Sequence, residues 1–327
     1  MNWTQKRVLV TGAGGFIGSH LTERLVELGA KTRAMTHYNA LGSYGWLSDS
    51  PRKKEIEFFA GDITDRDSVR QATRDVDIVF HLAALIAIPY SYQAPQSYVR
   101  TNIEGTMNVL QSVLENSVSL VLHTSTSEVY GTAQFVPITE AHPLQGQSPY
   151  SASKIGADKM VEAFRASFRI PAITIRPFNT FGPRQSARAV VPTIITQLLR
   201  GNAVKLGHLQ TTRDLNFVSN TVDGYVMAAE NPQAIGQTVH FGSGREISIG
   251  DLATTIARLM SKEMVVESEA GRMRPEKSEV ERLLADSSAA RRWFGWEPRV
   301  SLEDGLTETI HWLEKNLHRY QADGYVI

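Results

Sequence analysis

The sequence predicts an α/β protein with a doubly wound parallel sheet and a smaller, interleaved α/β domain. Three observations support this fold class. In the first half of the chain, short apolar segments alternate with longer amphipathic ones, a pattern typical of parallel strands with helices on both faces. A glycine-rich turn directly follows the first apolar segment. After Pro177 the spacing becomes irregular, and glycine and proline punctuate shorter elements.

The predicted elements follow one another along the chain. Strands are expected at residues 7–11, 31–36, 56–60, 78–81, 120–124 and 172–176. Apolar residues at helical spacing predict helices at residues 16–28, 67–73, 98–115, 150–168, 249–260 and 301–317. Ser301, with Asp304 three residues later, is an acidic variant of a capping box. We expect a first domain of residues 1–178, to which residues 214–242 return, and a second domain of residues 179–213 and 243–327.

The composition excludes several classes of function. Among 327 residues, 34 Lys plus Arg balance 34 Asp plus Glu, which argues against nucleic acid or an anionic membrane as the main partner. The absence of cysteine excludes disulfides, thiolate metal sites and a cysteine nucleophile, and the nine histidines show no metal-binding spacing. The apolar stretch 78–90 is too short to span a membrane. With no apolar leader before Val8, we expect a cytoplasmic protein.

The segment after the first strand indicates a dinucleotide site. Gly12, Gly15 and Gly18 lie between the first predicted strand and the first predicted helix. Glycine permits a tight turn, close approach of the backbone to a pyrophosphate, and close packing of helix on strand. The helix N-terminus adds free amides and a partial positive charge. The setting between a strand and a helix, more than the spacing alone, predicts dinucleotide binding in a Rossmann-like fold.

The choice between NAD and NADP is less sharply marked. The acidic residue that binds the adenosine ribose in such folds would fall near position 36, where this sequence has Thr36 followed by His37. Without that carboxylate, either Arg33 or His37 is a candidate for accepting a 2′-phosphate, and both are equally consistent with solvated residues. Asp62 is a candidate acceptor for the adenine amino group, or a plain turn residue. We expect NAD, with NADP not excluded.

Tyr150 and Lys154 are four residues apart on a predicted helix, so they share one face. To act as a base near neutral pH, the phenol must lose about three pKa units, or about 4 kcal/mol. A cation about 4 Å away supplies about that much at an effective dielectric constant of about 20. We therefore expect Lys154 to lower the pKa of Tyr150. The same spacing is common on surface helices where it has only a structural role. Other motifs are therefore needed to support a catalytic role for this pair.

Five motifs occur in order through nearly the whole chain. They are Thr11-Gly-Ala-Gly-Gly-Phe-Ile-Gly18, His81-Leu-Ala-Ala84, Asn102 in Thr-Asn-Ile-Glu-Gly-Thr, Tyr150-x-x-x-Lys154 and Arg176-Pro-Phe-Asn179. Together they resemble the extended short-chain dehydrogenase/reductase family, in its NAD-dependent epimerase/dehydratase group. The resemblance implies a nicotinamide cofactor, a nucleotide-sugar substrate and a homodimer through the helices at 98–115 and 150–168. The cofactor contacts it implies are Gly12, Gly15, Phe16, Ile17, Gly18, Thr36, Asp62, Ile63, Leu82, Ala83, Ala84, Asn102, Tyr150 and Lys154.

The resemblance also implies a reaction. Thr126, Ser127 and Glu128 follow the strand at 120–124, at the edge where such sheets bind ligands. In the family, the residue matching Thr126 hydrogen-bonds the sugar 4-hydroxyl and the residue matching Tyr150 removes its proton as NAD oxidises C4. Glu128 matches the carboxylate that takes the C5 hydrogen in 4,6-dehydratases. Ser127 replaces the Asp that protonates the 6-hydroxyl in dTDP-glucose dehydratases, so we hypothesise that protonated Glu128 also serves as this acid.

Flanking segments favour one member of this group by resemblance. Residues 85–92, 128–134, 143–150 and 182–188 are similar to UDP- or GDP-N-acetylglucosamine 4,6-dehydratases of the legionaminic-acid pathway type, which share the Thr-Ser-Glu triplet. UDP-glucuronate decarboxylases also share the triplet and are an alternative. Nucleotide-sugar 4-epimerases are another, although they generally lack a carboxylate matching Glu128. A dinucleotide sensor without catalytic activity is disfavoured by the presence of Thr126, Tyr150 and Lys154.

The candidate substrate contacts lie after the last predicted strand of the sheet. In the family, residues matching Asn179, Arg213 and Arg274 commonly contact the substrate phosphates, and Arg188 is a further candidate. Guanidinium groups suit a diphosphate because they stay charged and bind two oxygens at once. A surface salt bridge explains any single arginine equally well, so this prediction rests on the set. The last two candidates are Val190 and Leu206. They are expected to line the pocket for the nucleotide base, and the alternative is that they are plain core residues.

Overall fold

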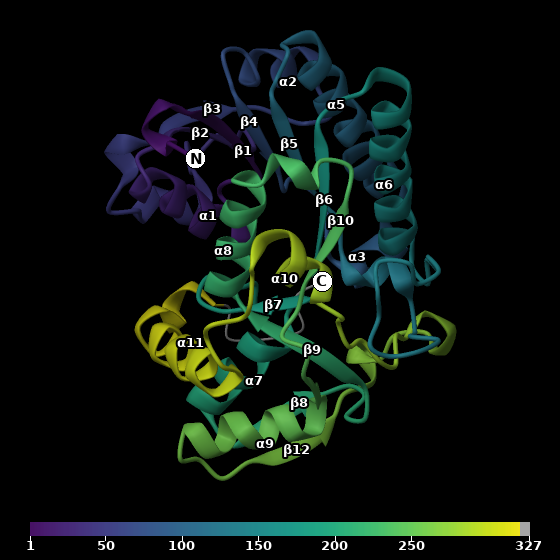
Figure 1. Cartoon of the computed structure of the whole chain (residues 1–327). Coiled ribbons are helices and arrows are strands. Elements are labelled where there is room, and N and C mark those ends of the chain that lie inside the picture. The colour runs from purple at the N-terminus through teal and green to yellow at the C-terminus, as the bar shows by residue number, and fades with distance from the viewer. Residues whose placement is uncertain (321–327) are drawn as a thin grey trace.

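The computed structural model describes residues 1–320, and its centre is a seven-stranded parallel sheet (Figure 1). The strand order is β10-β6-β5-β4-β1-β2-β3. The bounds are β1 (Arg7–Thr11), β2 (Lys31–Thr36), β3 (Glu57–Ala60), β4 (Ile78–His81), β5 (Leu120–Thr124), β6 (Ala172–Pro177) and β10 (Thr238–Phe241). This confirms the predicted fold class and, within one residue at each end, the predicted strands. β10 was not among the predicted strands.

Helices cover both faces of this sheet. Two of them share one face, α1 (Phe16–Glu27) and α8 (Val218–Ala229). Three cover the other, α2 (Arg66–Ala72), α5 (Gly105–Glu115) and α6 (Pro149–Phe168). Successive strand residues point to opposite faces, so Val8 and Val10 of β1 pack with α1 while Leu9 packs with α5. The sheet is therefore buried on both sides, as a parallel sheet requires.

The region predicted as a single helix at 98–115 is interrupted. The short helix α4 (Pro95–Tyr98) leads into a π-helical turn, η4 (Val99–Glu104), and α5 begins only after it. A π-turn of this kind is frequently found at functional sites, and this one carries Asn102. Val99, Leu114 and Phe168 are 46%, 44% and 52% exposed on the helices expected to form the homodimer, which stays a prediction.

The other elements lie mainly below the sheet in Figure 1 and include two small sheets, β11-β9-β7 and β12-β8. Their strands are β7 (Asn179–Phe181), β8 (Ala203–Leu206), β9 (Thr212–Phe217), β11 (Glu246–Ser248) and β12 (Val265–Ser268). The helices are α3 (Ile88–Gln93), α7 (Val190–Arg200), α9 (Ile249–Leu259), α10 (Ser288–Phe294) and α11 (Leu302–Asn316). The short helical turns are η1 (Trp3–Gln5), η2 (Gly45–Asp49), η3 (Lys53–Glu55), η5 (Ser127–Tyr130), η6 (Pro232–Ala234), η7 (Ala270–Arg272), η8 (Glu276–Ser278) and η9 (Leu317–Arg319).

The division into two domains stays a prediction, and residues 321–327 of the predicted second domain lie outside the described residues. The predicted cap of α11 is present, because the Ser301 hydroxyl oxygen accepts the N–H of Asp304. Within residues 1–320, no helix has the length and apolar character needed to cross a bilayer. The same residues contain no cluster of three or more His, Asp or Glu side chains suited to a metal ion.

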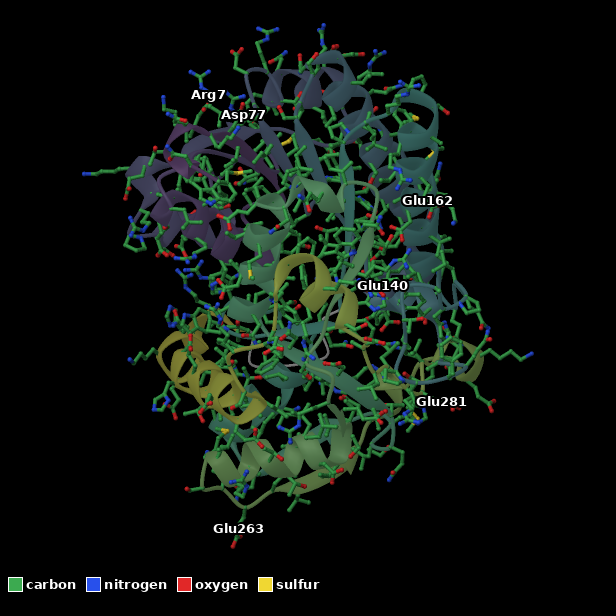
Figure 2. The ribbon with its side chains drawn as sticks, viewed as in Figure 1. Arg7, Asp77, Glu140, Glu162, Glu263 and Glu281 are labelled. Atoms are coloured by element: carbon green, nitrogen blue, oxygen red, sulfur yellow. The ribbon has the colours of Figure 1, made fainter. Side chains whose placement is uncertain are left out.

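The two ends of the parallel strands have different environments. At the amino ends, Asp77 Oδ2 accepts the backbone N–H of Arg7 (2.8 Å), and the Asp77 carbonyl accepts the N–H of Ser119 (3.0 Å). These bonds tie together the starts of β1, β4 and β5, at the edge where Figure 2 labels Arg7 and Asp77. At the carboxyl ends, the chain instead leaves the sheet in loops that carry most of the candidate site residues, which is the usual binding edge of such sheets.

The start of α6 is fixed by a reciprocal cap. The Ser148 hydroxyl oxygen accepts the N–H of Ser151 (3.1 Å), and the Ser151 hydroxyl oxygen accepts the N–H of Ser148 (2.9 Å). Pro149 occupies the first helical turn, where its missing N–H and fixed φ are no disadvantage. The cap therefore sets where the first turn of α6 begins, and that turn carries Tyr150.

We expect Ser148→Ala to lower the free energy of unfolding by about 1 kcal/mol, the usual loss when an N-cap hydroxyl is removed. Urea unfolding followed by circular dichroism measures the change. Ser148→Thr keeps the hydroxyl and serves as the control. Equal stability of the Ala and Thr variants would contradict the assigned role of this cap.

Candidate active site

The turn between β1 and α1 requires glycine at two positions. Gly12 has a φ of 70°, and a Cβ there would lie 2.8 Å from the backbone nitrogen of Ala83. A Cβ on Gly18 would collide with the carbonyl oxygen of Gly12. The first glycine thus lets the turn pack against the loop after β4, and the second lets α1 pack against the turn.

The N-terminus of α1 is suited to an anion. Its N-cap is Gly15, which provides no side-chain cap, and the first turn contains no acidic residue. The amides of Phe16 and Ile17 belong to that turn and have no carbonyl partner within the helix. Gly15 is exposed, and a Cβ there would meet only the Gly12 carbonyl within 4 Å. The residues present therefore fit the pyrophosphate of a dinucleotide.

A buried hydroxyl holds the loop after β4, which contains Leu82, Ala83 and Ala84. Thr11 Oγ1 accepts the backbone N–H of Leu82 and that of Ala83, both at 3.1 Å. Its own proton is then donated to His81 Nδ1 (2.9 Å). Burial, and secondarily the neighbouring charges of His123 and Lys154, lower the pKa of His81, so this histidine is neutral. The loop is thus tied to the end of β1 beside the glycine turn.

Asn102 fixes the far end of the same loop. Its Oδ1 accepts the N–H of Leu85 (2.9 Å), and its Nδ2 donates to the Leu85 carbonyl and to Ser153 Oγ, both at 2.9 Å. Both N–H groups of the side chain are therefore used within the protein. Asn102 joins the loop after β4 to α6, which positions backbone around the predicted cofactor site. Its predicted direct contact with the cofactor stays a prediction.

The candidate contacts for the adenosine half of the dinucleotide lie at the carboxyl ends of β2 and β3. Asp62 Oδ1 accepts the N–H and the hydroxyl of Thr64 (2.8 and 2.9 Å), and Asp62 Oδ2 lies 3.2 Å from His37 Nε2. Burial raises the pKa of Asp62, but these hydrogen bonds lower it overall. Thr36 is buried at the end of β2, where the strand was predicted to end, and its contact with the cofactor stays a prediction.

The alternative that Arg33 accepts a 2′-phosphate is wrong. Arg33 lies in the middle of β2, and its Nε donates to Glu57 Oε1 (2.7 Å). Its Nη1 donates to the carbonyls of Ala72 and Arg74 (2.7 and 2.9 Å). The guanidinium is thus held away from the carboxyl end of the strand, and it is not available for a 2′-phosphate. His37 remains exposed beside Asp62.

Ile63 has a packing role in the structure. It is buried, and its side chain fills the space where a Cβ on Gly105 would lie. Its carbonyl accepts the Nδ2 N–H of Asn108 (3.0 Å). Ile63 therefore joins the loop after β3 to the start of α5, and its contact with a cofactor stays a prediction.

The predicted reactive groups meet in a buried cluster. Tyr150 is 7% exposed and packs edge-on against Tyr98, with ring centroids 6.2 Å apart. Thr126 Oγ1 accepts the N–H of Glu128 (3.2 Å), which leaves its own hydroxyl to donate to the Tyr150 phenol. Burial raises the pKa of Tyr150, the hydrogen bond from Thr126 lowers it, and the charge of Glu128 raises it. Glu128 is therefore close enough to Tyr150 for its charge to act on the phenol.

Lys154 is buried on α6, one turn after Tyr150. Its Nζ donates to the carbonyl oxygen of Thr124 at the end of β5 (2.6 Å). Burial lowers the pKa of Lys154 to about 8, and the charge of Asp158 opposes this shift. Burial raises the pKa of Tyr150 in this structure, and the expected effect of Lys154 on this pKa stays a prediction. The bond from Lys154 to Thr124 links the first turns of α6 to the end of β5.

Two of the predicted substrate arginines share one carboxylate. Arg213 Nη2 lies 3.3 Å from Glu279 Oε1, and Arg274 Nη1 lies 3.8 Å from the same oxygen. Burial lowers the pKa of Arg213, whereas the charge of Glu128 raises it and that of Arg274 lowers it. Glu128 thus acts on both Tyr150 and Arg213, which places all three candidates in one region.

The other four candidate substrate contacts lie in different surroundings. Asn179 begins β7, and its buried Oδ1 has no hydrogen-bond partner among the described residues. Arg188 is half-buried, and its charge reaches Tyr98 beside the reactive cluster. Leu206 is buried in the core at the end of β8, and Val190 packs against the same core at the start of α7. These two resemble core residues, and their base-pocket role stays a prediction.

Three side chains near the candidate site residues were not predicted from the sequence. They are Asp158, Glu279 and Tyr98. Asp158 lies four residues after Lys154 on the same helix face, a spacing that signals contact. Glu279 and Tyr98 have no comparable signal, because their partners lie far away in the chain. Ser127, which was predicted, is buried as the first residue of η5.

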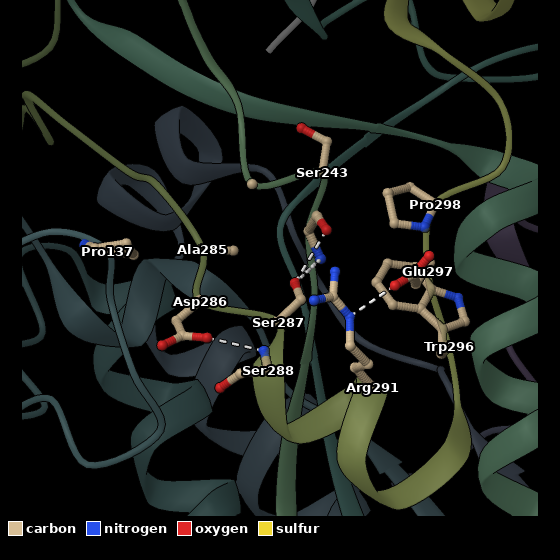
Figure 3. A pocket seen from close by; sticks show the side chains of 12 residues that line it. Pro137, Ser243, Ala285, Asp286, Ser287, Ser288, Arg291, Trp296, Glu297 and Pro298 are labelled. Atoms are coloured by element: carbon tan, nitrogen blue, oxygen red, sulfur yellow. Dashed lines mark hydrogen bonds and ion pairs between the residues drawn. The ribbon is translucent and has the colours of Figure 1, made fainter.

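A separate cavity of about 270 Å³ lies elsewhere in the molecule (Figure 3). Ser243, Asp286 and Ser287 line it, and the ion pair between Arg291 Nε and Glu297 Oε1 (2.7 Å) is at its edge. None of the predicted site residues lines this cavity. It is therefore distinct from the candidate active site.

The loop 182–188, which leads to Arg188, is held against α1. Arg184 forms an ion pair with Glu23 (Nη1 to Oε2, 2.9 Å), and His20 Nε2 is 3.0 Å from the carbonyl oxygen of Pro183. Burial, and next the charge of Arg184, lower the pKa of His20 to about 4. Neutral His20 therefore donates its Nε2 proton to Pro183.

Comparison with known proteins gives consistent matches. The GDP-mannose 4,6 dehydratase family model matches residues 9–309. A UDP-glucose 4-epimerase from Mycolicibacterium smegmatis is 32% identical over 310 residues, covering 93% of this chain and 97% of that protein. A dTDP-glucose 4,6-dehydratase from an Actinoplanes species is 30% identical over 318 residues, covering 95% and 98%. DesIV, a dTDP-glucose 4,6-dehydratase from Streptomyces venezuelae solved with NAD and TYD, has a TM-score of 0.87 at 28% identity, covering 96% and 99%.

We expect His20 to make the protein less stable in mild acid. Its native pKa of about 4 lies below the unfolded value of about 6.5. Protons therefore bind preferentially to the unfolded chain, and stability is lost as the pH falls below about 6.5. Between about pH 7.5 and 5.5 this group removes about 1 kcal/mol from the free energy of unfolding.

His20→Gln keeps an N–H donor for Pro183 but does not titrate, so urea unfolding at the two pH values should show a smaller acid loss than in the wild type. The exposed His311 offers the control variant His311→Gln. An equal acid loss in wild type and His20→Gln would refute the neutral role of His20.

Proposed function

Because the chain belongs to the NAD-dependent epimerase/dehydratase group of the extended short-chain dehydrogenase/reductase family, we propose that it is a nucleotide-sugar 4,6-dehydratase. The proposed substrate is UDP- or GDP-N-acetylglucosamine, and the product is the 4-keto-6-deoxy sugar. The membership itself makes the protein an enzyme of the nucleotide-sugar dehydratase and epimerase family. The specific reaction and substrate are the proposal.

One observation carries this proposal, the shared surroundings of Tyr150, Glu128 and Arg213. The charge of Glu128 acts on the Tyr150 phenol and on the Arg213 guanidinium, and all three side chains are buried. A base for the 4-hydroxyl, a carboxylate for the C5 hydrogen and a cation for the diphosphate are the groups that dehydration of a nucleotide hexose needs. An epimerase needs no such carboxylate.

The glycine turn supports NAD as the cofactor. The uncapped amides at Phe16 and Ile17 would hold its pyrophosphate, and the loop Leu82–Ala84, fixed by Thr11 and Asn102, would line the same edge. When bound, NAD supplies the acceptor for the electron pair of C4 and returns that pair at C6. Asp62 places a carboxylate 3.2 Å from His37, the residue that follows β2.

The side chains of this protein would then carry out three proton transfers. Tyr150 takes the proton of the 4-hydroxyl, assisted by the hydroxyl of Thr126, which donates to the phenolate. Glu128 takes the proton from C5, which the 4-ketone makes acidic. The same carboxyl then gives this proton to the 6-hydroxyl as the C6–O bond breaks, so that water leaves and a C5–C6 double bond forms. C5 takes up a proton when the electron pair returns at C6, and this balances the proton that Tyr150 removed. Ser127 has no acidic proton to give to the 6-hydroxyl, so Glu128 would both take the C5 proton and protonate the leaving group.

Mass spectrometry tests the proposal directly. Purified protein is incubated separately with UDP-N-acetylglucosamine, GDP-N-acetylglucosamine and UDP-glucuronate. We expect loss of water from one of the N-acetylglucosamine nucleotides. Loss of carbon dioxide from UDP-glucuronate would replace the proposal with the decarboxylase alternative. Conversion to an isomer of unchanged mass, resolved by chromatography, would replace it with the epimerase alternative.

Glu128→Gln should abolish water loss because an amide neither takes the C5 proton nor donates to the leaving hydroxyl. We expect kcat to fall on the order of 10²- to 10⁴-fold. In deuterated water, wild-type product should gain one deuterium at C5, and the variant should leave the substrate unlabelled. Glu230→Gln is the control, since Glu230 Oε1 accepts the indole N–H of Trp3 (2.7 Å) and an amide oxygen preserves that bond. Full activity of Glu128→Gln would refute the assigned role.

A further inference from the structure

A buried ion pair joins α6 to β6 and bonds to the segment that carries Glu128. Asp158 of α6 is 1% exposed and Arg176 of β6 is 3% exposed. Arg176 donates to Asp158 Oδ2 through Nη2 (2.9 Å) and Nε (3.3 Å), and His123 Nε2 is 3.0 Å from Asp158 Oδ1. Burial raises the pKa of Asp158, but the hydrogen bond from His123 and the charges of Arg176 and Lys154 lower it to about 2. The carboxylate is therefore charged.

This ion pair contacts the segment 125–130 at both of its ends. At the first end, Ser125 Oγ donates to Asp158 Oδ2 (2.7 Å). At the last end, the Tyr130 hydroxyl accepts a hydrogen bond from Arg176 Nη1 (2.6 Å). Thr126, Ser127 and Glu128 lie between these two anchors.

The hydrogen bonds at Tyr130 have a single consistent direction. Because the hydroxyl accepts from Arg176, its own proton is donated to His240 Nε2 (2.6 Å). His240 Nδ1 then donates to the Asp286 carbonyl (3.2 Å). Burial, and next the charge of Arg176, lower the pKa of His240 to about 3, which agrees with a neutral ring that accepts at Nε2. Tyr130 is thus held from both sides.

Between the anchors the backbone has little freedom. Thr126 is extended and caps the turn η5, which spans Ser127–Tyr130, by accepting the N–H of Glu128. The carbonyl of Val129 accepts the N–H of Gln145 (2.8 Å). With its two ends and its middle bonded, the segment sets the direction from which the Glu128 side chain leaves the backbone.

Stability alone does not explain an ion pair at this depth. Replacing a buried ion pair by well-packed apolar side chains is often neutral or stabilising, because removing two charges from water is costly. Apolar residues would offer the segment no directional bonds. Asp158 and Arg176 present a carboxylate oxygen to Ser125 and an N–H to Tyr130, and this directional contact is what the charges add.

We propose that Asp158 and Arg176 act through Ser125 and Tyr130 as a clamp that holds Glu128 in position relative to Tyr150. The four residues are positioning residues, since Asp158 and Arg176 act through bonds to the two ends of the segment that carries Glu128. The proposal deepens the proposed function and rests on it, because Glu128 is the group being positioned. A displacement of about 1 Å at a reacting group is enough to cost about 100-fold in rate.

Kinetics of the intact enzyme test the clamp. Ser125→Ala and Tyr130→Phe each remove one anchor. We expect each to lower kcat for water loss about 10- to 100-fold and to change KM less than about twofold, since the arginines that bind the diphosphate are untouched. The matched control is Tyr225→Phe. It removes a buried hydroxyl that forms a hydrogen bond with Thr124 Oγ1 (2.7 Å), in the residue just before Ser125. We expect this variant to keep kcat within about twofold of wild type.

Amide hydrogen exchange gives a readout that needs no turnover. A peptide covering residues 125–131 should exchange at least about tenfold faster in Ser125→Ala and Tyr130→Phe than in wild type or Tyr225→Phe. Unchanged exchange in both anchor variants would overturn the clamp whatever the activity. Faster exchange with unchanged kcat would overturn the positioning role. Faster exchange in a protein that dehydrates no nucleotide sugar would support the clamp and refute the proposed function instead.

Discussion

All seven strands of the central sheet run in one direction, so their carboxyl ends meet at a single edge. This constraint brings together loops whose residues are far apart in the chain. The glycine turn follows β1, the Leu82–Ala84 loop follows β4, and the segment with Thr126 and Glu128 follows β5. At the opposite edge, bonds of Asp77 tie together the starts of β1, β4 and β5.

The second organising feature is burial of charge. Lys154, Asp158, Arg176 and Arg213 are all nearly inaccessible to water, and each has a partner of opposite charge or a carbonyl. In a site shielded from solvent, the direction of each donor matters more than it does at the surface. Thr126 illustrates this, because its Oγ1 accepts the N–H of Glu128 and its hydroxyl is left to donate to Tyr150. The chemistry proposed here depends on such orientation more than on any single strongly reactive group.

Much of the fold could be predicted from the sequence because strands, helices and the glycine turn have local signals. Periodicity placed six strands of the sheet almost to the residue, and the Tyr150–Lys154 spacing placed both side chains in the first turns of one helix. What each side chain touches depends on distant segments. Lys154 finds the carbonyl of Thr124, and Arg33 finds the carbonyls of Ala72 and Arg74. The π-helical turn at Asn102 likewise has no periodic signal, since it is one local departure inside a helical pattern.

The carboxylate of Glu279 lies between the two arginines, 3.3 Å from Arg213 Nη2 and 3.8 Å from Arg274 Nη1. Its negative charge offsets part of their combined positive charge and holds the two guanidinium groups near one another. An anion that reached both arginines would therefore meet a carboxylate that is already tethered beside them.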